Sequence, residues 1–292
     1  MSKKISDLKT TNSLAKTDKV LVETPAGTKL APVAAFHDDG YDGVDLTVVF
    51  ADEINENFSG DPWAWILDRC RRRDYTGLHV KDFIPFNMNG NVIEAQIAGI
   101  EPYFHATDQS LAGHIDFISR DLYPENIQWN TSNVNQGNST NANPYMVSNL
   151  KARLDQLVAY LPNELKNVIL NKRSLMESRY TAGQTLQSST SWAWCDLGKL
   201  WVPHETEVFG SLRWSGKYAG GNGVKYPIFN DGRVIVKHFG KNGNCANWWE
   251  CDAMDASATY ACSVYNYGIA NYTIASITSV AAPVCFRIGY NA

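Results

Sequence analysis

The sequence lacks most of the features that would assign it to a familiar functional class. Basic charge is not in excess, since 26 Lys and Arg face 30 Asp and Glu and the net charge is −4. This argues against a nucleic acid or an anionic membrane as an electrostatic partner. No apolar run approaches the roughly 20 residues of a membrane-spanning helix. Met1–Asp7 opens with basic residues but lacks the apolar stretch of a signal peptide.

The signatures of metal and nucleotide sites are also missing. The six cysteines are scattered, with no Cys-x-x-Cys pair and no histidine at zinc-ligand spacing. No His-Glu-x-x-His motif or phosphate-binding glycine loop occurs. We therefore predict no metal site and no cofactor. The cysteines are expected to be mostly reduced, although pairing of Cys251 with Cys245 or Cys262 stays open.

One stretch lacks positive charge altogether. From Ala246 to Phe286 there is no Lys or Arg, and the segment is rich in Tyr, Ser, Asn and Thr. Tyrosines among short polar residues are what paratopes use to bind with little loss of conformational entropy. The alternative is a set of polar strands with ordinary outward tyrosines. The predicted ligand-binding residues are Trp248, Trp249, Asp252, Asp255, Ser257, Tyr260, Tyr265, Tyr267 and Tyr272.

The first 74 residues are expected to lie outside the main domain. Residues 1–35 contain two short strands around a Pro25-Ala26-Gly27 turn, too small to fold alone. Residues 36–74 are predicted to be an acidic linker, with a strand at Leu46–Phe50, followed by a helix. The helix begins at Asp61-Pro62, a favourable N-cap and first-turn pair. A calcium site is the alternative use of the acidic residues, although their spacing lacks the order of a calcium loop.

From residue 75 onward the pattern predicts an α+β fold. Asn89-Gly90 between apolar alternating runs predicts a hairpin over 83–100, and 114–119 reads as a strand. Apolar spacing predicts helices over 147–161 and 165–169. Residues 173–181 are expected to be irregular, and a Trp- and Gly-rich β region follows.

Two resemblances rest on these segments. Lys4-Ile5-Ser6-Asp7-Leu8 and Asp18-Lys19-Val20-Leu21-Val22 resemble the N-terminal attachment segments of phage tail and fibre proteins. The motifs HIDFISRD, NPYMVSNL, LWVPHETEVFG, NWWECD and VCFRIG, in this order, resemble a C-type-lectin-like domain found in phage structural proteins. That family is distantly related to the formylglycine-generating-enzyme fold. The resemblance implies a compact α+β domain over 75–292, with two helices, a small loop-rich sheet and an exposed final segment.

Two other possible functions, catalysis and metal-dependent sugar binding, are less well supported by the sequence. His204, Glu205 and Glu207 could suggest acid–base chemistry, but the resemblance implies that they start a structural helix. The segments that formylglycine-generating relatives need, and the Glu-Pro-Asn and Trp-Asn-Asp triplets of calcium-dependent lectins, are both absent. We therefore predict no catalytic residues.

The sequence predicts a phage virion protein that displays its C-terminal face to a host surface. Its expected partners are other virion proteins, through residues 1–35, and a host cell-surface protein or glycan. We expect a homotrimer on the virion surface, made in the bacterial cytoplasm and without nucleic acid or membrane insertion. The alternatives are a decoration or head-fibre protein without a fixed receptor and, third, an enzyme.

The composition of residues 250–279 also suggests how the face arose. Most of its residue types are those reached when the adenines of an Asn codon are replaced at random, as in phages that diversify such domains by reverse transcription. Trp248, Trp249, Phe286 and Ile288 would be fixed, and a fixed polar surface is the alternative. The candidate variable positions are Asp252, Ala253, Asp255, Ser257, Thr259, Tyr260, Ser263, Tyr265, Tyr267 and Tyr272.

Overall fold

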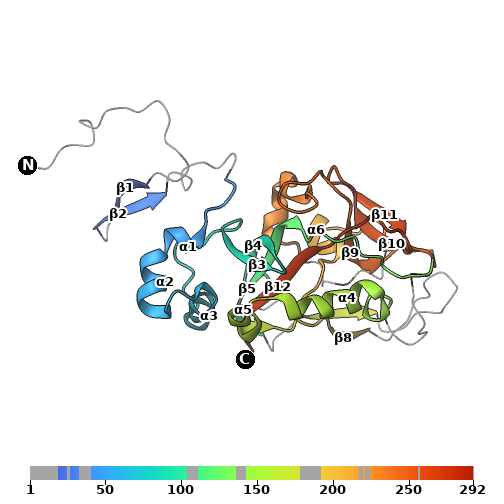
Figure 1. Ribbon diagram of the computed structural model, residues 1–292, viewed down its shortest axis with the longest axis horizontal. Coiled ribbons are helices and arrows are strands. Elements are labelled where there is room, and N and C mark those ends of the chain that lie inside the picture. Colours follow the sequence, from blue (N-terminus) through green and yellow to red (C-terminus); the bar gives the residue numbers. More distant parts are fainter. Residues whose placement is uncertain are drawn as a thin grey trace, which may run out of the picture. The chain divides into compact units, whose positions relative to one another are not determined.

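The chain divides into two compact units, residues 1–44 and 45–292 (Figure 1). The computed structural model describes residues 19–24, 27–32, 41–103, 111–135, 143–177, 192–216, 220, 224–255 and 257–291. In the first unit, β1 (Lys19–Thr24) pairs antiparallel with β2 (Gly27–Pro32), so the two predicted strands are confirmed.

A five-stranded antiparallel sheet forms the centre of the second unit. Its strand order is β3-β4-β5-β12-β6, and the last strand of the chain pairs with β5 (Figure 1). Apolar residues of β5 and β12 face each other, as in the Phe117–Phe286 pair, whose stacked rings have centroids 5.1 Å apart. The strands are β3 (Phe83–Met88), β4 (Asn91–Ile100), β5 (Leu111–Leu122), β6 (Ile169–Leu170) and β12 (Pro283–Asn291).

The predicted hairpin is confirmed at its turn. Asn89 and Gly90 both have positive φ, 50° and 80°, as a type I′ turn requires. The Gly90 N–H also donates to Asn87 Oδ1 at 2.9 Å. This local chemistry fixes the register of β3 against β4, in which Met88 pairs with Asn91.

Three helices pack at one end of the second unit: α1 (Leu46–Val49), α2 (Ala51–Phe58) and α3 (Pro62–Arg72). The Asp61 carboxylate accepts from the N–H groups of Trp63 and Ala64, so the predicted cap of α3 is confirmed. Trp63 lies edge-on to Phe117 and Phe286, which anchors α3 to the central sheet. Such edge-to-face ring pairs contribute about 0.5–1.5 kcal/mol each.

The expected strand at Leu46–Phe50 is wrong, because those residues form α1. Asp45 caps the helix through Thr47 N–H, and Leu46 is fully buried whereas Val48 is 66% exposed. A β-branched run therefore forms a helix because one cap and one buried leucine outweigh strand propensity. The predicted boundary at residue 75 also differs from the structure, in which the division falls between Val44 and Asp45.

Two further predicted helices occur close to their expected positions. α4 (Asn149–Leu157) begins at Ser148, whose Oγ accepts from Lys151 N–H, and continues as the 3-10 turn η4 (Val158–Tyr160). It is preceded by η3 (Tyr145–Val147), and α5 (Asn163–Val168) follows Pro162. Buried leucines at 150, 154, 157 and 165 face the core.

The expectation that residues 173–181 are irregular is wrong for the part that the structure describes. β7 (Arg173–Glu177) pairs antiparallel with β8 (Trp192–Asp196), and Glu177 lies opposite Trp192. The partner strand is distant in sequence, so no local pattern identifies β7. The chain then forms α6 (Glu205–Phe209) and the 3-10 turns η7 (Pro227–Asn230) and η8 (Gly232–Ile235).

A second sheet closes the other end of the second unit (Figure 1). Its order is β11-β10-β9, from β9 (Trp248–Ala253), β10 (Tyr260–Val264) and β11 (Ala270–Ile274). Six α-helices with antiparallel sheets in the described residues confirm the α+β class, although the resemblance implied only two helices. No helix among the described residues is long and apolar enough to span a membrane.

Candidate binding face and the polar layer beneath it

The β10–β11 ladder presents its tyrosines on one side. Paired residues of an antiparallel ladder share a face. Tyr260 pairs with Ile274 and Cys262 with Tyr272, so these four lie on the same side. Ala261 and Ser263 occupy the other side, where both are buried.

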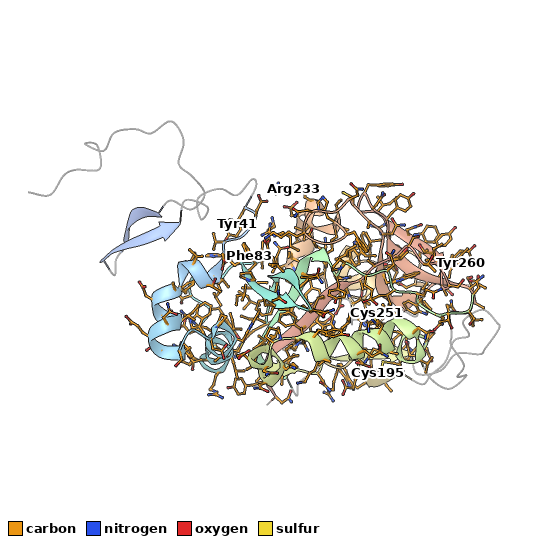
Figure 2. All side chains as sticks on the ribbon, viewed as in Figure 1. Tyr41, Phe83, Cys195, Arg233, Cys251 and Tyr260 are labelled. Carbon is orange, nitrogen blue, oxygen red and sulfur yellow. The ribbon has the colours of Figure 1, made fainter. Side chains whose placement is uncertain are left out.

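Ring contacts join the tyrosines to a tryptophan from a distant loop. Trp214 lies edge-on to Tyr272 with centroids 4.6 Å apart, and Tyr272 lies edge-on to Tyr260 at 5.2 Å. Trp214 Nε1 donates to the Ala270 carbonyl at 3.2 Å, which directs the indole along β11. Figure 2 shows Tyr260 at the periphery of the second unit, whereas Cys251 is fully buried.

The turn after β10 carries a second, separate pair of contacting rings. Tyr265 and Tyr267 contact each other at 4.5 Å between centroids, and their exposed fractions are 36% and 62%. The turn is fixed by Gly268, which has φ of 87° and donates to the Tyr265 carbonyl. We call Trp214, Tyr260, Tyr265, Tyr267 and Tyr272 the aromatic face.

Glu205, at the start of α6, holds the loop that carries Trp214. Its carboxylate accepts from the backbone N–H groups of Arg213, Trp214 and Ser215, at 2.8, 2.8 and 3.0 Å. The Ser215 hydroxyl donates to it as well, at 2.5 Å. Glu205 itself is fully buried. Its carboxylate therefore ties the backbone of this loop to the interior of the domain.

Trp248 and Trp249 are scaffold and not contact residues. Both are fully buried, and their indole N–H groups donate to the carbonyls of Ile235 and Ile127. Trp249 also contacts the buried Trp129, at 6.0 Å between centroids. The prediction that these tryptophans touch a ligand is therefore wrong, because β9 is covered on both sides.

Asp252 is likewise not a surface contact residue. It is 4% exposed and accepts from the backbone N–H groups of Glu205 and Gly220 at 2.8 and 3.1 Å. Its other contact is His204 Nδ1 at 2.9 Å. Burial opposes ionisation of Asp252, but His204 and these N–H groups outweigh it and lower its pKa.

The opposite nitrogen of His204 completes a Ser-His-Asp chain. His204 Nε2 lies 2.8 Å from Ser174 Oγ, the order in which serine hydrolases arrange these groups. All three side chains are buried, and a Cβ added to Gly220 would lie 2.3 Å from the imidazole. Close packing of Gly220 on the ring suits a structural role, in which His204 also caps α6 as predicted.

The remaining predicted positions are buried or half-buried. Ala253 and Ser263 are buried, so their assignment as exposed variable positions is wrong. Asp255, Ser257 and Thr259 are half-buried. The Ser257 carbonyl accepts from Asn135 Nδ2, which ties this segment to the body of the unit.

A buried acidic cluster lies next to the aromatic face, with Cys262 on the same side of β10 as Tyr260. Oxygens of Glu205 and Glu250 and the sulfur of Cys262 lie within 4.8 Å of one another. Within the described part of the chain, neither carboxylate oxygen of Glu250 has a hydrogen-bond partner. Burial, with Glu205 and Asp252 nearby, raises the pKa of Glu250 well above its usual range.

A network of buried charges connects α6 to the central sheet. Lys172 pairs with Glu207 and lies 3.9 Å from the centre of the Trp201 ring. Tyr226 donates to Asp116 at 2.7 Å, and Arg287 binds the same carboxylate through two nitrogens. Glu207 is therefore held in a structural ion pair.

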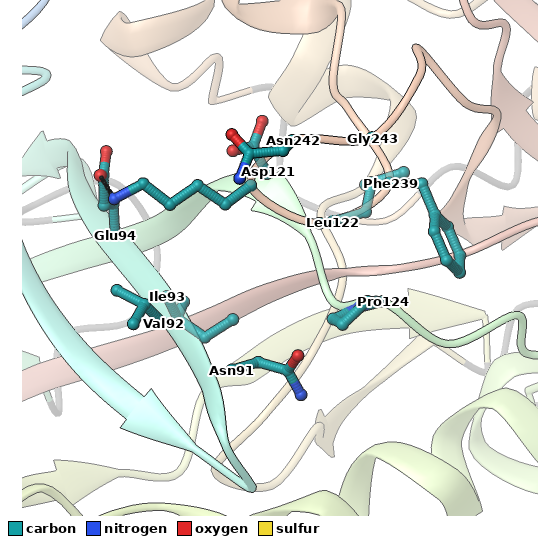
Figure 3. Close-up of a pocket in the computed structure, with 12 residues that line it drawn as sticks. Asn91, Val92, Ile93, Glu94, Asp121, Leu122, Pro124, Phe239, Asn242 and Gly243 are labelled. Atoms are coloured by element: carbon teal, nitrogen blue, oxygen red, sulfur yellow. Dashed lines mark ion pairs between the residues drawn. The ribbon is translucent and has the colours of Figure 1, made fainter.

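A cavity of about 250 Å³ lies elsewhere, between β4 and the loop after η8 (Figure 3). Phe239, Leu122 and Pro124 supply its apolar wall, and Lys241 pairs with Glu94 at 2.9 Å. None of the predicted binding residues lines it.

All six cysteines are free in the structure, including Cys245, Cys251 and Cys262. Comparison with protein-family models, curated proteins and solved structures finds no match.

Sequence reasoning missed Trp214, Leu212 and Ile269, which are 39%, 50% and 51% exposed. Trp214 lies in a glycine-rich stretch far from β10 in the sequence, so only the fold brings it to the tyrosines. Glu250 and Cys262 were missed as a cluster because a bulge in the β9–β10 ladder obscures their alignment. The signal available in the sequence was Glu250 itself, a charged residue directly after two tryptophans in a predicted strand region.

Proposed function

We propose that this chain is a phage virion protein whose C-type-lectin-like domain binds a bacterial surface through the aromatic face. The observation that carries the proposal is two groups of contacting, exposed or half-exposed rings at the β10–β11 hairpin, one of three rings and one of two. The rings from Tyr260 to Trp214 are in contact, and the strands behind them are fixed by buried tryptophans. Contact residues of this kind lose little entropy on binding.

The chemistry of the face indicates the class of ligand. No Lys or Arg lies between residues 246 and 286, so the ladder offers little attraction to an anionic polymer. Exposed indole and phenol rings instead suit the apolar faces of sugars or the side chains of a surface protein. A cell-surface glycan or protein is the proposed partner.

Binding to whole bacteria tests the proposal directly. Labelled full-length protein is incubated with cells of the species that carries the encoding genome, and bound label is measured against protein concentration. We expect saturable binding that falls at least tenfold in Trp214→Ala and in Tyr267→Ala, because central aromatic anchors commonly contribute 2 kcal/mol or more.

Matched controls separate the face from general surface hydrophobicity. Trp192 and Tyr160 are 38% and 41% exposed and lie outside the face. Trp192→Ala and Tyr160→Ala should bind as the parent does. Equal losses in all four variants, or no binding by the parent protein, would favour a decoration protein without a fixed receptor.

The diversification hypothesis is retained for a smaller set of positions. Tyr265 and Tyr267 are exposed, and Asp255, Ser257, Thr259, Tyr260 and Tyr272 are half-buried. Substitutions at such positions usually change stability by about 0.5 kcal/mol or less. A near-copy of this stretch in the genome, with adenines at these codons beside a reverse-transcriptase gene, is the expected finding.

A further inference from the structure

We propose that Glu205, Glu250 and Cys262 bind a divalent cation of the zinc class next to the aromatic face. The three side chains come from α6, β9 and β10, and all are fully buried. Their ligand atoms lie within 4.8 Å of one another. The inference concerns the interior of the domain and does not rest on the proposed function.

Glu250 points most directly to a ligand. Both of its oxygens are buried, and neither has a hydrogen-bond partner among the residues that the structure describes. An unsatisfied buried carboxyl group usually costs several kcal/mol, and native proteins rarely retain one without a purpose. A cation held between Glu250 and its neighbours would remove this penalty.

Glu205 retains capacity for such a ligand. Its Oε2 accepts from Arg213 N, Ser215 N and Ser215 Oγ, whereas Oε1 accepts from Trp214 N alone among the described residues. A carboxylate oxygen has two lone pairs, so Oε1 can also coordinate a cation. The cation would then fix the same carboxylate that holds the Trp214 loop.

The donor set selects the type of cation. Calcium and magnesium take oxygen ligands, whereas a thiolate with carboxylates suits zinc. Ligand atoms around a tetrahedral zinc lie roughly 3.5 Å apart, given bonds of about 2.0–2.3 Å. The side chains therefore need to move by only about an ångström, and a water can supply the fourth ligand.

Metal content and thermal unfolding of the full-length protein test the site. We expect one equivalent of zinc to bind, and the unfolding midpoint to rise by about 5–10 °C at zinc concentrations near 100 times the dissociation constant. Calcium and magnesium should have no such effect. In the cobalt-substituted protein, a thiolate-to-cobalt charge-transfer band should appear, which reports Cys262 ligation without any mutation.

Two variants and two matched controls locate the site. Glu250→Gln and Cys262→Ser should lose the bound zinc and the shift in midpoint. Glu177 is another fully buried carboxylate for which the described ranges provide no side-chain partner, and Cys251 is another fully buried thiol. Glu177→Gln and Cys251→Ala should retain both properties.

The opposing results are equally distinct. If Glu250 is simply a neutral acid that donates to Glu205, the parent protein will bind no zinc and its midpoint will not respond. Zinc binding that survives Cys262→Ser, or a midpoint shift with calcium alone, would also overturn the proposal. None of these measurements depends on cell binding, so failure here and failure of the proposed function are distinguishable.

Discussion

Lys237 is the residue whose environment most directly predicts a pH dependence. It is fully buried, and its ammonium donates to the carbonyls of Ser119 and Arg120 at 2.7 and 3.1 Å. Burial lowers the pKa of Lys237 from 10.5 to about 8. Between these two values the unfolded chain keeps a proton that the folded protein has lost, so this lysine's contribution to stability rises with pH.

Lys237→Met should therefore change stability in a pH-dependent way. At pH 7 the parent protein bears the full penalty of the buried charge, whereas the methionine variant does not. The stability of the variant minus that of the parent should fall by up to about 3 kcal/mol between pH 7.5 and 10.5. Urea unfolding at several pH values measures it, and the exposed Lys241→Met should show no such trend.

His204 is predicted to be structural. His204→Ala would leave the buried Asp252 carboxylate without its charged or hydrogen-bonding side-chain partner, which should destabilise the fold by about 3–5 kcal/mol. Ser174→Ala should cost less, about 1–3 kcal/mol.

The same two variants test for catalysis. We expect no turnover of a simple ester substrate by the parent protein, because Ser174 is only 2% exposed. Hydrolysis that is present in the parent and lost in a folded Ser174→Ala protein would show that the Ser-His-Asp chain is an active site.

At the scale of elements, the β3–β4 turn allows a clean test of backbone conformation. Gly90 has φ of 80°, and a Cβ added there would meet nothing within 4 Å. Gly90→Ala should therefore lower stability by about 1–2 kcal/mol through the left-handed conformation alone. Gly232 has the same open surroundings without a positive φ, so Gly232→Ala should be within about 0.5 kcal/mol of the parent. Equal effects in urea unfolding would contradict this account.

At the scale of the whole molecule, the first unit is predicted to attach the chain to the particle. The division at Val44–Asp45 leaves the second unit with its own core. Deleting residues 1–35 should leave a folded protein with an unchanged thermal midpoint that no longer enters particles. Normal incorporation of the shortened chain would disprove the attachment role.

The assembled protein is expected to be a trimer. Two short strands bury little surface by themselves, so β1 and β2 would gain stability from neighbouring copies. Light scattering of the purified full-length protein should give three times the chain mass of 32.5 kDa. A monomer at micromolar concentration, with single copies in the particle, would rule this out.

The sequence alone determined the features that depend on neighbouring residues. The Asp61 cap of α3, the Asn89-Gly90 turn, the leucine spacing of α4 and the β1–β2 pair are local, since each rests on residues a few positions apart. The α+β class followed from the order of these elements. The tyrosine-rich segment was also recognisable, because composition survives without knowledge of the fold.

Only the tertiary structure decided which of those residues face the solvent and which partners they meet. Burial of Trp248, Trp249 and Asp252 depends on layers contributed by residues 127–129, 204–205 and 220. Pairing of β7 with β8, the arrival of Trp214 beside Tyr272 and the meeting of Glu205, Glu250 and Cys262 likewise join distant segments. Contacts of this kind are specified by the packing of the whole core, and no local spacing in the chain encodes them.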